Sequence, residues 1–108
     1  GPEVSYNMAN IYVTKGEYQL AVGNYGSAQT FNAALAKLLN GDKEGCVKTI
    51  DGSKDASTGM GHYLKAVAAA RMANQTLLLE NIAKAASIDP SLKAKAQKDK
   101  EFMKYKID

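Results

Sequence analysis

A three-residue turn pattern occurs twice in this chain and limits its fold more than any other feature. Gly16-Glu17-Tyr18 is matched by Gly41-Asp42-Lys43, and each copy lies between two short segments whose apolar residues recur at helical spacing. Glycine commonly ends a helix because it adopts the left-handed conformation without a side-chain penalty. The repetition predicts an all-α chain of stacked helical hairpins. Such chains bind other macromolecules far more often than they catalyse reactions.

The composition agrees with a single helical domain. The chain has 108 residues, which is enough for one modest hydrophobic core. Valine and isoleucine are sparse while alanine is abundant, and this favours helices over sheet. No apolar run approaches the ~20 residues that a membrane span needs. Gly1-Pro2 is typical of a scar left by a protease, so we exclude it from the fold and expect a segment of a larger protein.

Seven helices are predicted from the spacing of apolar residues. They form three antiparallel pairs over residues 3–90, because the connecting loops are short, and one capping helix over residues 91–108. Asp42, Asn74 and Ser91 are predicted to cap the helices that follow them, and Pro90 separates the last two helices. The predicted ranges are about 3–15, 17–25, 28–40, 42–50, 56–73, 74–88 and 91–108, with a loop over 51–55.

The chain resembles the tetratricopeptide repeat family. In that family a small residue and a tyrosine in the first helix precede a Gly-Asp-Tyr-like turn, and a small residue, an aromatic, an alanine and a proline follow. This sequence departs from the family in spacing, because its turn glycines are 25 residues apart, against a usual repeat of about 34. The third turn, Ala73-Asn74-Gln75, has lost its glycine. The matching residues are Met8, Ala9, Tyr12, Gly16-Glu17-Tyr18, Ala21 and Tyr25 in the first unit, Ala33, Ala34, Gly41, Asp42, Cys46 and Ile50 more loosely in the second, and Ile82, Ala85 and Pro90 in the last.

The resemblance implies a fold and a cellular setting. The fold is a right-handed superhelix of about three antiparallel helix pairs, with the seventh helix as the solvating cap that such arrays require. Residues 30–36, 63–68 and 89–96 further resemble the C-terminal part of repeat proteins from the Bacteroidetes cell envelope. That likeness implies a bacterial periplasmic or cell-envelope location.

Members of the family hold a peptide or protein segment in a concave groove lined by the first helix of each pair. The resemblance implies an aromatic row of Tyr6, Phe31 and Tyr63, while Asn10 and Arg71 would hold backbone or carboxylate groups. The alternative is that the short repeats curve the array further and bury these side chains. A lysine–asparagine clamp for chaperone carboxylates is disfavoured, because Tyr6 and Leu35 occupy two of its positions. The implied groove residues are Tyr6, Asn10, Phe31, Leu35, Tyr63, Val67 and Arg71.

Residues that could support catalysis or hold a cofactor are few. His62 is the only histidine, which excludes a site with two histidine ligands. Cys46 is the only cysteine, which excludes an intramolecular disulfide and a multi-cysteine zinc site. Gly59-Met60-Gly61 lacks the third glycine and the preceding strand of a phosphate-binding loop. We therefore expect no enzymatic activity, no cofactor and no bound metal.

The net charge of +3 is confined to the end of the chain. Residues 3–90 contain eight basic and eight acidic side chains, whereas residues 91–108 contain six lysines and three acids. A basic segment of this kind can bind nucleic acid or an anionic membrane. The simpler interpretation is a solvated helix face with cations near a helix C-terminus.

The sequence thus predicts a non-catalytic protein–protein interaction or scaffold module. The expected partner is a protein or peptide segment, or further repeats of its own chain, and no small-molecule substrate is expected. Nucleic-acid binding is disfavoured and membrane contact would be at most peripheral. The alternative function is electrostatic binding to nucleic acid or an anionic membrane through the lysine-rich C-terminal helix.

Overall fold

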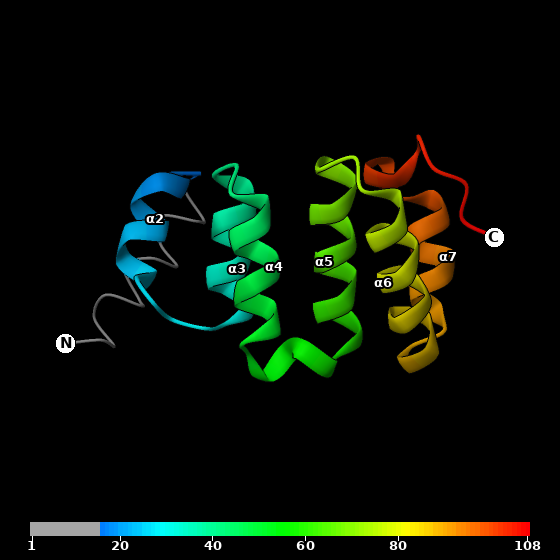
Figure 1. The fold of residues 1–108 in the computed structure, drawn as a ribbon, viewed down its shortest axis with the longest axis horizontal. Coiled ribbons are helices and arrows are strands. Elements are labelled where there is room, and N and C mark those ends of the chain that lie inside the picture. The colour runs from blue at the N-terminus through cyan, green and yellow to red at the C-terminus, as the bar shows by residue number, and fades with distance from the viewer. Residues whose placement is uncertain (1–15) are drawn as a thin grey trace. The chain divides into compact units, whose positions relative to one another are not determined.

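The computed structural model describes residues 16–108, which form helices and turns (Figure 1). No strand occurs among these residues, so the predicted all-α class is confirmed for this part of the chain. The helix predicted over 3–15, together with Tyr6 and Asn10, lies outside the described residues. The helices are α2 (Tyr18–Tyr25), α3 (Phe31–Leu39), α4 (Lys43–Asp51), α5 (Gly59–Arg71), α6 (Gln75–Ile88) and α7 (Ser91–Lys98), with short 3-10 helices at Lys54–Ser57 and Lys100–Phe102.

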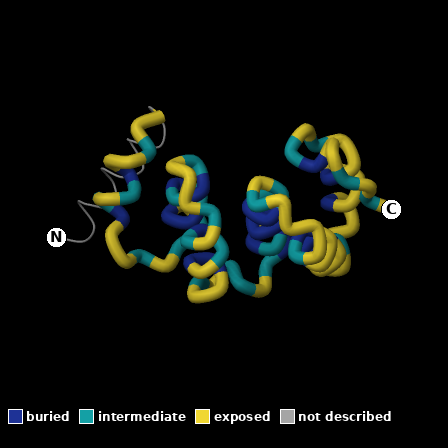
Figure 2. Tube along the Cα trace, turned by 45° about the horizontal axis from the view of Figure 1, so that its top comes forward, coloured by how far each residue is buried: buried dark blue, intermediate teal, exposed yellow. Residues whose placement is uncertain are grey.

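The chain divides after Ser53 into two compact units, and one buried cluster of the first consists of alanines and one tyrosine. In its described part α2 packs against α3, and α3 packs against α4. Ala21, Tyr25, Ala33 and Ala36 form a buried cluster between α2 and α3. Because alanine side chains are small, the two helices approach closely and the Tyr25 ring fills the remaining space. Figure 2 shows this burial along the facing sides of the helices.

The second unit is a helical hairpin with the C-terminal residues packed on it. Helices α5 and α6 form the hairpin, α7 packs on α6, and the 3-10 helix Lys100–Phe102 contacts both α5 and α7. Because the chain returns to α5, residues 99–105 lie beside this helix, which precedes them in the sequence by about one helical hairpin. The buried cluster of the unit consists of Tyr63, Ala66, Ala69, Leu78, Ile82, Ala85, Leu92, Ala96 and Phe102.

Two helices begin three residues later than the sequence predicted, because threonine side chains cap them. The Ala33 N–H donates to Thr30 Oγ1 (3.1 Å), so α3 begins at Phe31 and not near residue 28. The Gly61 N–H donates to Thr58 Oγ1 (3.0 Å), so α5 begins at Gly59 and not near residue 56. In both cases the apolar pattern extends beyond the cap and conceals the true start of the helix.

The final helix is much shorter than predicted. Helix α7 ends at Lys98, and the continuous helix expected up to residue 108 is wrong. Ser91 is the first helical residue and not the cap, because Asp89 Oδ1 accepts hydrogen bonds from both the N–H and the hydroxyl of Ser91 (3.1 and 2.7 Å). After α7, Asp99 accepts from the Glu101 N–H (3.0 Å) and starts the short 3-10 helix that turns Phe102 inward.

The repeated turn of the sequence occurs three times in the backbone. Gly16, Gly41 and Ala73 all have positive φ angles, of 79°, 94° and 55°. Each is followed by one N-cap residue and then by the first residue of a helix, α2, α4 or α6. The N-cap φ angles are −92°, −89° and −99°, and the ψ angles are 69°, 80° and 87°. The third turn therefore keeps the geometry of the other two without a glycine.

Two of the predicted caps are confirmed at these turns. The Gly45 N–H donates to Asp42 Oδ1 (2.9 Å), and the Leu77 N–H donates to Asn74 Oδ1 (3.1 Å). Each bond satisfies one of the N–H groups that the first turn of a helix leaves without a partner. The right-handed superhelix implied by the family resemblance stays a prediction.

Candidate functional site

The structure places the predicted groove residues in three groups. Tyr6 and Asn10 lie outside the described residues. Phe31 and Leu35 are half-buried on α3 in the first unit. Tyr63, Val67 and Arg71 lie on α5 in the second unit, at intervals of four residues that put them on one side of the helix. We call these three residues the α5 face.

Exposure differs sharply along the α5 face. Tyr63 is only 4% exposed, Val67 is half-buried against the cluster of the second unit, and Arg71 is exposed. The side chains that cover this face come from residues 99–105, which we call the C-terminal segment. The chain itself thus occupies part of the surface that was predicted to hold a partner.

Tyr63 makes the most buried contact with the C-terminal segment. Its hydroxyl donates a hydrogen bond to Asp99 Oδ2 (2.6 Å), a short bond of the kind that an ionised acceptor makes. Its ring meets the Phe102 ring edge-on, with centroids 5.5 Å apart and planes at 69°. Phe102 is 1% exposed, so this aromatic pair belongs to the core of the second unit.

Charges around Tyr63 are arranged to keep the hydroxyl neutral and the carboxylate ionised. Burial, and then the hydrogen bond and negative charge of Asp99, raise the pKa of Tyr63 well above its usual value. Burial opposes ionisation of Asp99, but hydrogen bonds from Tyr63 and the Glu101 N–H and the charge of Lys95 outweigh it and lower the pKa of Asp99. Lys95 Nζ also lies 5.5 Å from the centroid of the Tyr63 ring, within range of a cation–π contact.

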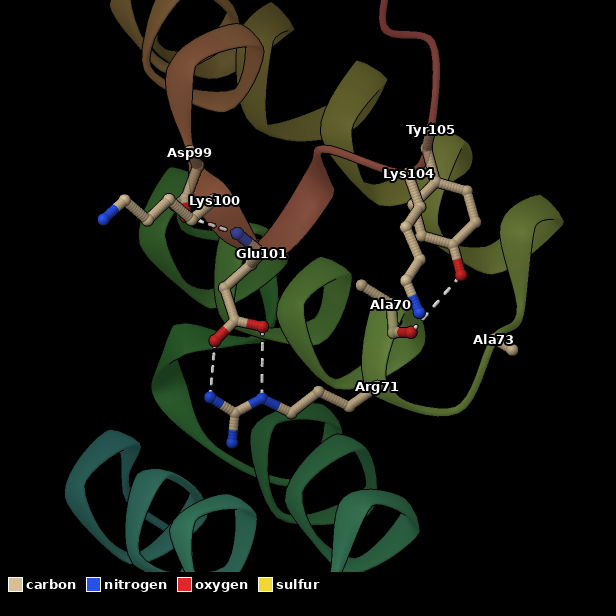
Figure 3. A pocket seen from close by; sticks show the side chains of 8 residues that line it. All are labelled: Ala70, Arg71, Ala73, Asp99, Lys100, Glu101, Lys104 and Tyr105. Carbon is tan, nitrogen blue, oxygen red and sulfur yellow. Dashed lines mark hydrogen bonds and ion pairs between the residues drawn. The ribbon is translucent and has the colours of Figure 1, made fainter.

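Arg71 holds a second carboxylate at the other end of the α5 face. Its Nε donates to Glu101 Oε2 (3.2 Å) and its Nη2 donates to Glu101 Oε1 (2.5 Å), a two-bond pairing that Figure 3 shows. The two side chains are 36% and 32% exposed, so water weakens the attraction. Close by, the Tyr105 hydroxyl donates a longer bond to the Ala70 carbonyl oxygen (3.4 Å).

A polar hollow of about 630 Å³ lies beside these contacts. Three basic and two acidic side chains reach it, and both acids already pair with α5 residues. The hollow can therefore accept polar or anionic groups. It is lined by Ala70, Arg71, Ala73, Asp99, Lys100, Glu101, Lys104 and Tyr105 (Figure 3).

His62, the one histidine, ties α5 to α6. Its Nδ1 is 3.2 Å from Asn81 Oδ1, and Asn81 Nδ2 donates to the Leu77 carbonyl oxygen (2.9 Å). Because the amide oxygen of Asn81 can only accept, this network assigns the proton to His62 Nδ1. Asn81 is 2% exposed, so the bond satisfies a polar group inside the hairpin. His62 has a structural explanation.

Cys46 and the acidic residues suggest no further site in the described part of the chain. Cys46 is fully buried on α4. Across residues 16–108, no group of three or more histidine, cysteine, aspartate or glutamate side chains is placed to hold a metal ion. No helix in that range is both long and apolar enough to cross a membrane.

The residues predicted from the sequence include three on α5 but none of those that cover the α5 face. Asp99, Glu101, Phe102 and Tyr105 were interpreted as parts of one long amphipathic helix. The available signal was Asp99, two residues before Glu101 in a lysine-rich run. An aspartate at such a position can cap a new turn or can lie on the exposed surface of a continuing helix. The tertiary contact with Tyr63 decides between the two.

Comparison with known proteins adds no relative. No protein-family model, no curated protein and no solved structure matches this chain.

Proposed function

We propose that this chain is a non-catalytic protein–protein interaction module that binds a segment of a partner protein on the α5 face. The partner is another protein, or further helical repeats of the same chain. The binding surface consists of an aromatic hydroxyl, an aliphatic side chain and a guanidinium, at Tyr63, Val67 and Arg71. These groups recognise acceptors and aromatic rings by non-covalent contacts alone.

The observation that supports this proposal is that the α5 face already holds a short segment through side chains. Asp99 meets Tyr63, Glu101 meets Arg71, and Phe102 packs against the Tyr63 ring. Only three residues of the C-terminal segment are helical. A surface that fixes a short, irregular segment with paired charges and an aromatic contact has the elements that peptide-binding sites use.

The test of this function compares two matched single variants as baits for partner capture. Arg71→Ala removes the guanidinium from the α5 face, whereas Lys84→Ala removes an exposed cation from α6 that pairs only weakly with Glu80 (3.5 Å). We expect at least one captured protein to lose about tenfold in enrichment with Arg71→Ala and to keep it with Lys84→Ala. If every captured protein binds both folded variants equally, the α5 face is not the binding surface.

A second candidate function rests on the lysines of the last segment. All six lysines of residues 91–108 are exposed, while Asp99 and Glu101 are engaged by Tyr63 and Arg71. Because Arg71 offsets the charge of Glu101, the lysines of residues 91–108 face fewer unpaired acids than the composition alone indicates. Binding to nucleic acid or an anionic membrane through these lysines would weaken steeply with salt, which separates it from binding on the α5 face.

A further inference from the structure

The C-terminal segment contacts α5 in the manner of a bound peptide. Within four consecutive residues it supplies two carboxylates and an aromatic ring, at Asp99, Glu101 and Phe102. The helix supplies the complementary groups, a hydroxyl donor and ring at Tyr63 and a two-bond donor at Arg71. Tyr63 and Arg71 are eight residues apart, a rise of about 12 Å along a helix. The pairing therefore spans about two turns of α5.

The polar contacts of the segment are of a kind that a competitor can replace. The Arg71–Glu101 pair is about one-third exposed, and such pairs hold weakly in water. The regular structure of the segment is a single 3-10 turn over Lys100–Phe102. Elements with few regular backbone hydrogen bonds open locally more often than packed helices do.

Phe102 determines which side chain a competing segment must supply. The ring is 1% exposed and packs edge-on against Tyr63, so its departure alone would leave a cavity in the core of the second unit. A partner segment that inserts its own aromatic ring fills that cavity. Replacing the Phe102 ring by an aromatic ring of the partner therefore costs much less free energy than detaching the segment and leaving the cavity empty.

We propose that the C-terminal segment is an internal ligand of the α5 face, and that the partner displaces it with a segment of the same chemistry. That partner segment carries two carboxylates separated by one residue and followed by an aromatic ring, as in Asp99-Lys100-Glu101-Phe102. This inference rests on the proposed function and adds to it the chemical class of the partner and a built-in competitor.

The internal ligand lowers the apparent affinity of any partner. A tethered segment competes at an effective concentration that is about millimolar for a short flexible connection. The site is open only during the fraction of time in which the segment is detached, and partner affinity falls in proportion to that fraction. Changes that loosen the segment should therefore tighten partner binding, the reverse of what they would do if the segment formed part of the binding surface.

The test uses a labelled peptide with the sequence of residues 97–106 and blocked ends, added to the full chain. The protein variant is the double change Asp99→Ala and Glu101→Ala, which loosens the tethered segment and leaves α5 intact. We expect this variant to bind the peptide about tenfold or more tightly than the native chain does. Adding Arg71→Ala should abolish the gain, while adding Lys84→Ala should leave it. A control peptide with D99N and E101Q keeps the shape, removes both charges and should not compete.

Three results of the peptide-binding experiment would overturn the inference. They are equal peptide binding by the native chain and the loosened variant, equal binding with and without Arg71→Ala, and equal competition by the neutral control peptide. A dimer of the native chain in light scattering that Arg71→Ala abolishes would show that the natural occupant is the C-terminal segment of a second copy, which also overturns the inference.

Hydrogen exchange on the native chain gives a second test that needs no variant. The Phe102 and Tyr105 N–H groups donate to Asp99 O (3.1 Å) and Phe102 O (2.9 Å) inside the segment. An internal ligand that detaches should let these amides exchange about tenfold or more faster than the core amides of α5 and α6. Equal protection would mean that the segment leaves only when the whole unit unfolds, and the inference would then be wrong.

These outcomes are distinguishable from failure of the proposed function. If Arg71→Ala abolishes partner capture but the acidic aromatic peptide does not bind, the α5 face is the binding site and only the partner chemistry is wrong. If Arg71→Ala leaves capture unchanged while the peptide binds the loosened variant, the internal contact is real and the proposed function is wrong.

Discussion

At the scale of single residues, the second unit depends on one tyrosine with two roles. The Tyr63 ring belongs to the hydrophobic cluster and its hydroxyl fixes the Asp99 carboxylate. The ring role was predictable, since helical spacing placed Tyr63 on the same side of α5 as Val67. The hydroxyl role was not, because Asp99 lies 36 residues away and no local rule pairs the two.

The hydroxyl can be tested separately from the ring with Tyr63→Phe. The change leaves the Phe102 contact in place and removes the donor to an ionised acceptor, so we expect unfolding to become easier by about 1–2 kcal/mol. Urea unfolding followed by circular dichroism measures this loss. Tyr105→Phe is the matched control, because its hydroxyl makes only a 3.4 Å bond to Ala70, and we expect a loss below about 0.5 kcal/mol. Equal losses in the two variants would contradict the importance of the Asp99 bond.

The Asp99 carboxylate should make stability fall in acid. Its pKa is lowered in the folded chain, so near about pH 4, where an unfolded aspartate titrates, the unfolded chain binds more protons than the folded one. The stabilisation is therefore complete above that pH and is lost as the pH falls through the folded pKa. Asp99→Asn should remove this part of the acid sensitivity, seen as a smaller fall in the urea midpoint below about pH 5. Parallel pH profiles for the native chain and the variant would contradict this account.

At the scale of elements, the start of α5 is fixed by a close approach of two pieces of backbone. A Cβ added to Gly61 would lie 1.8 Å from the Asp55 carbonyl oxygen, in the 3-10 helix that precedes α5. No side chain fits there unless the backbone moves. In the sequence this glycine stands out only as part of a run that fails to match a phosphate-binding loop, whereas in the structure packing explains it.

Two glycine-to-alanine changes should therefore act in opposite directions. Gly61→Ala forces the 3-10 helix away from α5 and should destabilise the chain by about 1–3 kcal/mol. Gly23→Ala lies inside α2, where an added Cβ meets nothing within 4 Å, so the higher helix propensity of alanine should stabilise the chain by up to about 1 kcal/mol. Thermal or urea unfolding of both variants measures the difference. A stabilising Gly61→Ala would show that the close approach is not required.

Local rules predicted most of the elements and failed where a distant contact decided the structure. Asp42 and Asn74 cap their helices as expected, because capping needs only the next few residues. The end of α7 at Lys98 was missed, because Phe102, Met103 and the lysines after Lys98 continue a helical pattern. What ends the helix is the burial of Phe102 against α5, and sequence spacing contains no information on that contact. The occupant of the α5 face was missed for the same reason.

At the scale of the whole molecule, the charge is unevenly distributed. The entire excess of +3 lies in the last 18 residues, in the second unit, and all six lysines of this stretch are exposed. Such a patch attracts any polyanion at low ionic strength. Weak attraction of this kind is not the same as a nucleic-acid- or membrane-binding function. The salt dependence of binding distinguishes the two.

Binding to a short double-stranded DNA and to anionic vesicles should follow this charge. We expect weak binding at low salt that disappears near physiological ionic strength, where the screening length is about 8 Å. Lys98→Ala with Lys104→Ala should reduce the dependence of log affinity on log salt by about 2, whereas Lys48→Ala in the first unit should leave it unchanged. Tight binding that persists at physiological salt would instead favour the electrostatic function.

The three turns with matching dihedral angles have a consequence for how this chain is compared with other proteins. Ala73 keeps the left-handed conformation that Gly16 and Gly41 adopt, although an alanine there is disfavoured by about 1–2 kcal/mol. The same backbone turn can therefore occur where the glycine that usually marks it in a sequence is absent. A comparison that scores turn geometry will find three similar positions in this chain, whereas one that scores glycine will find two.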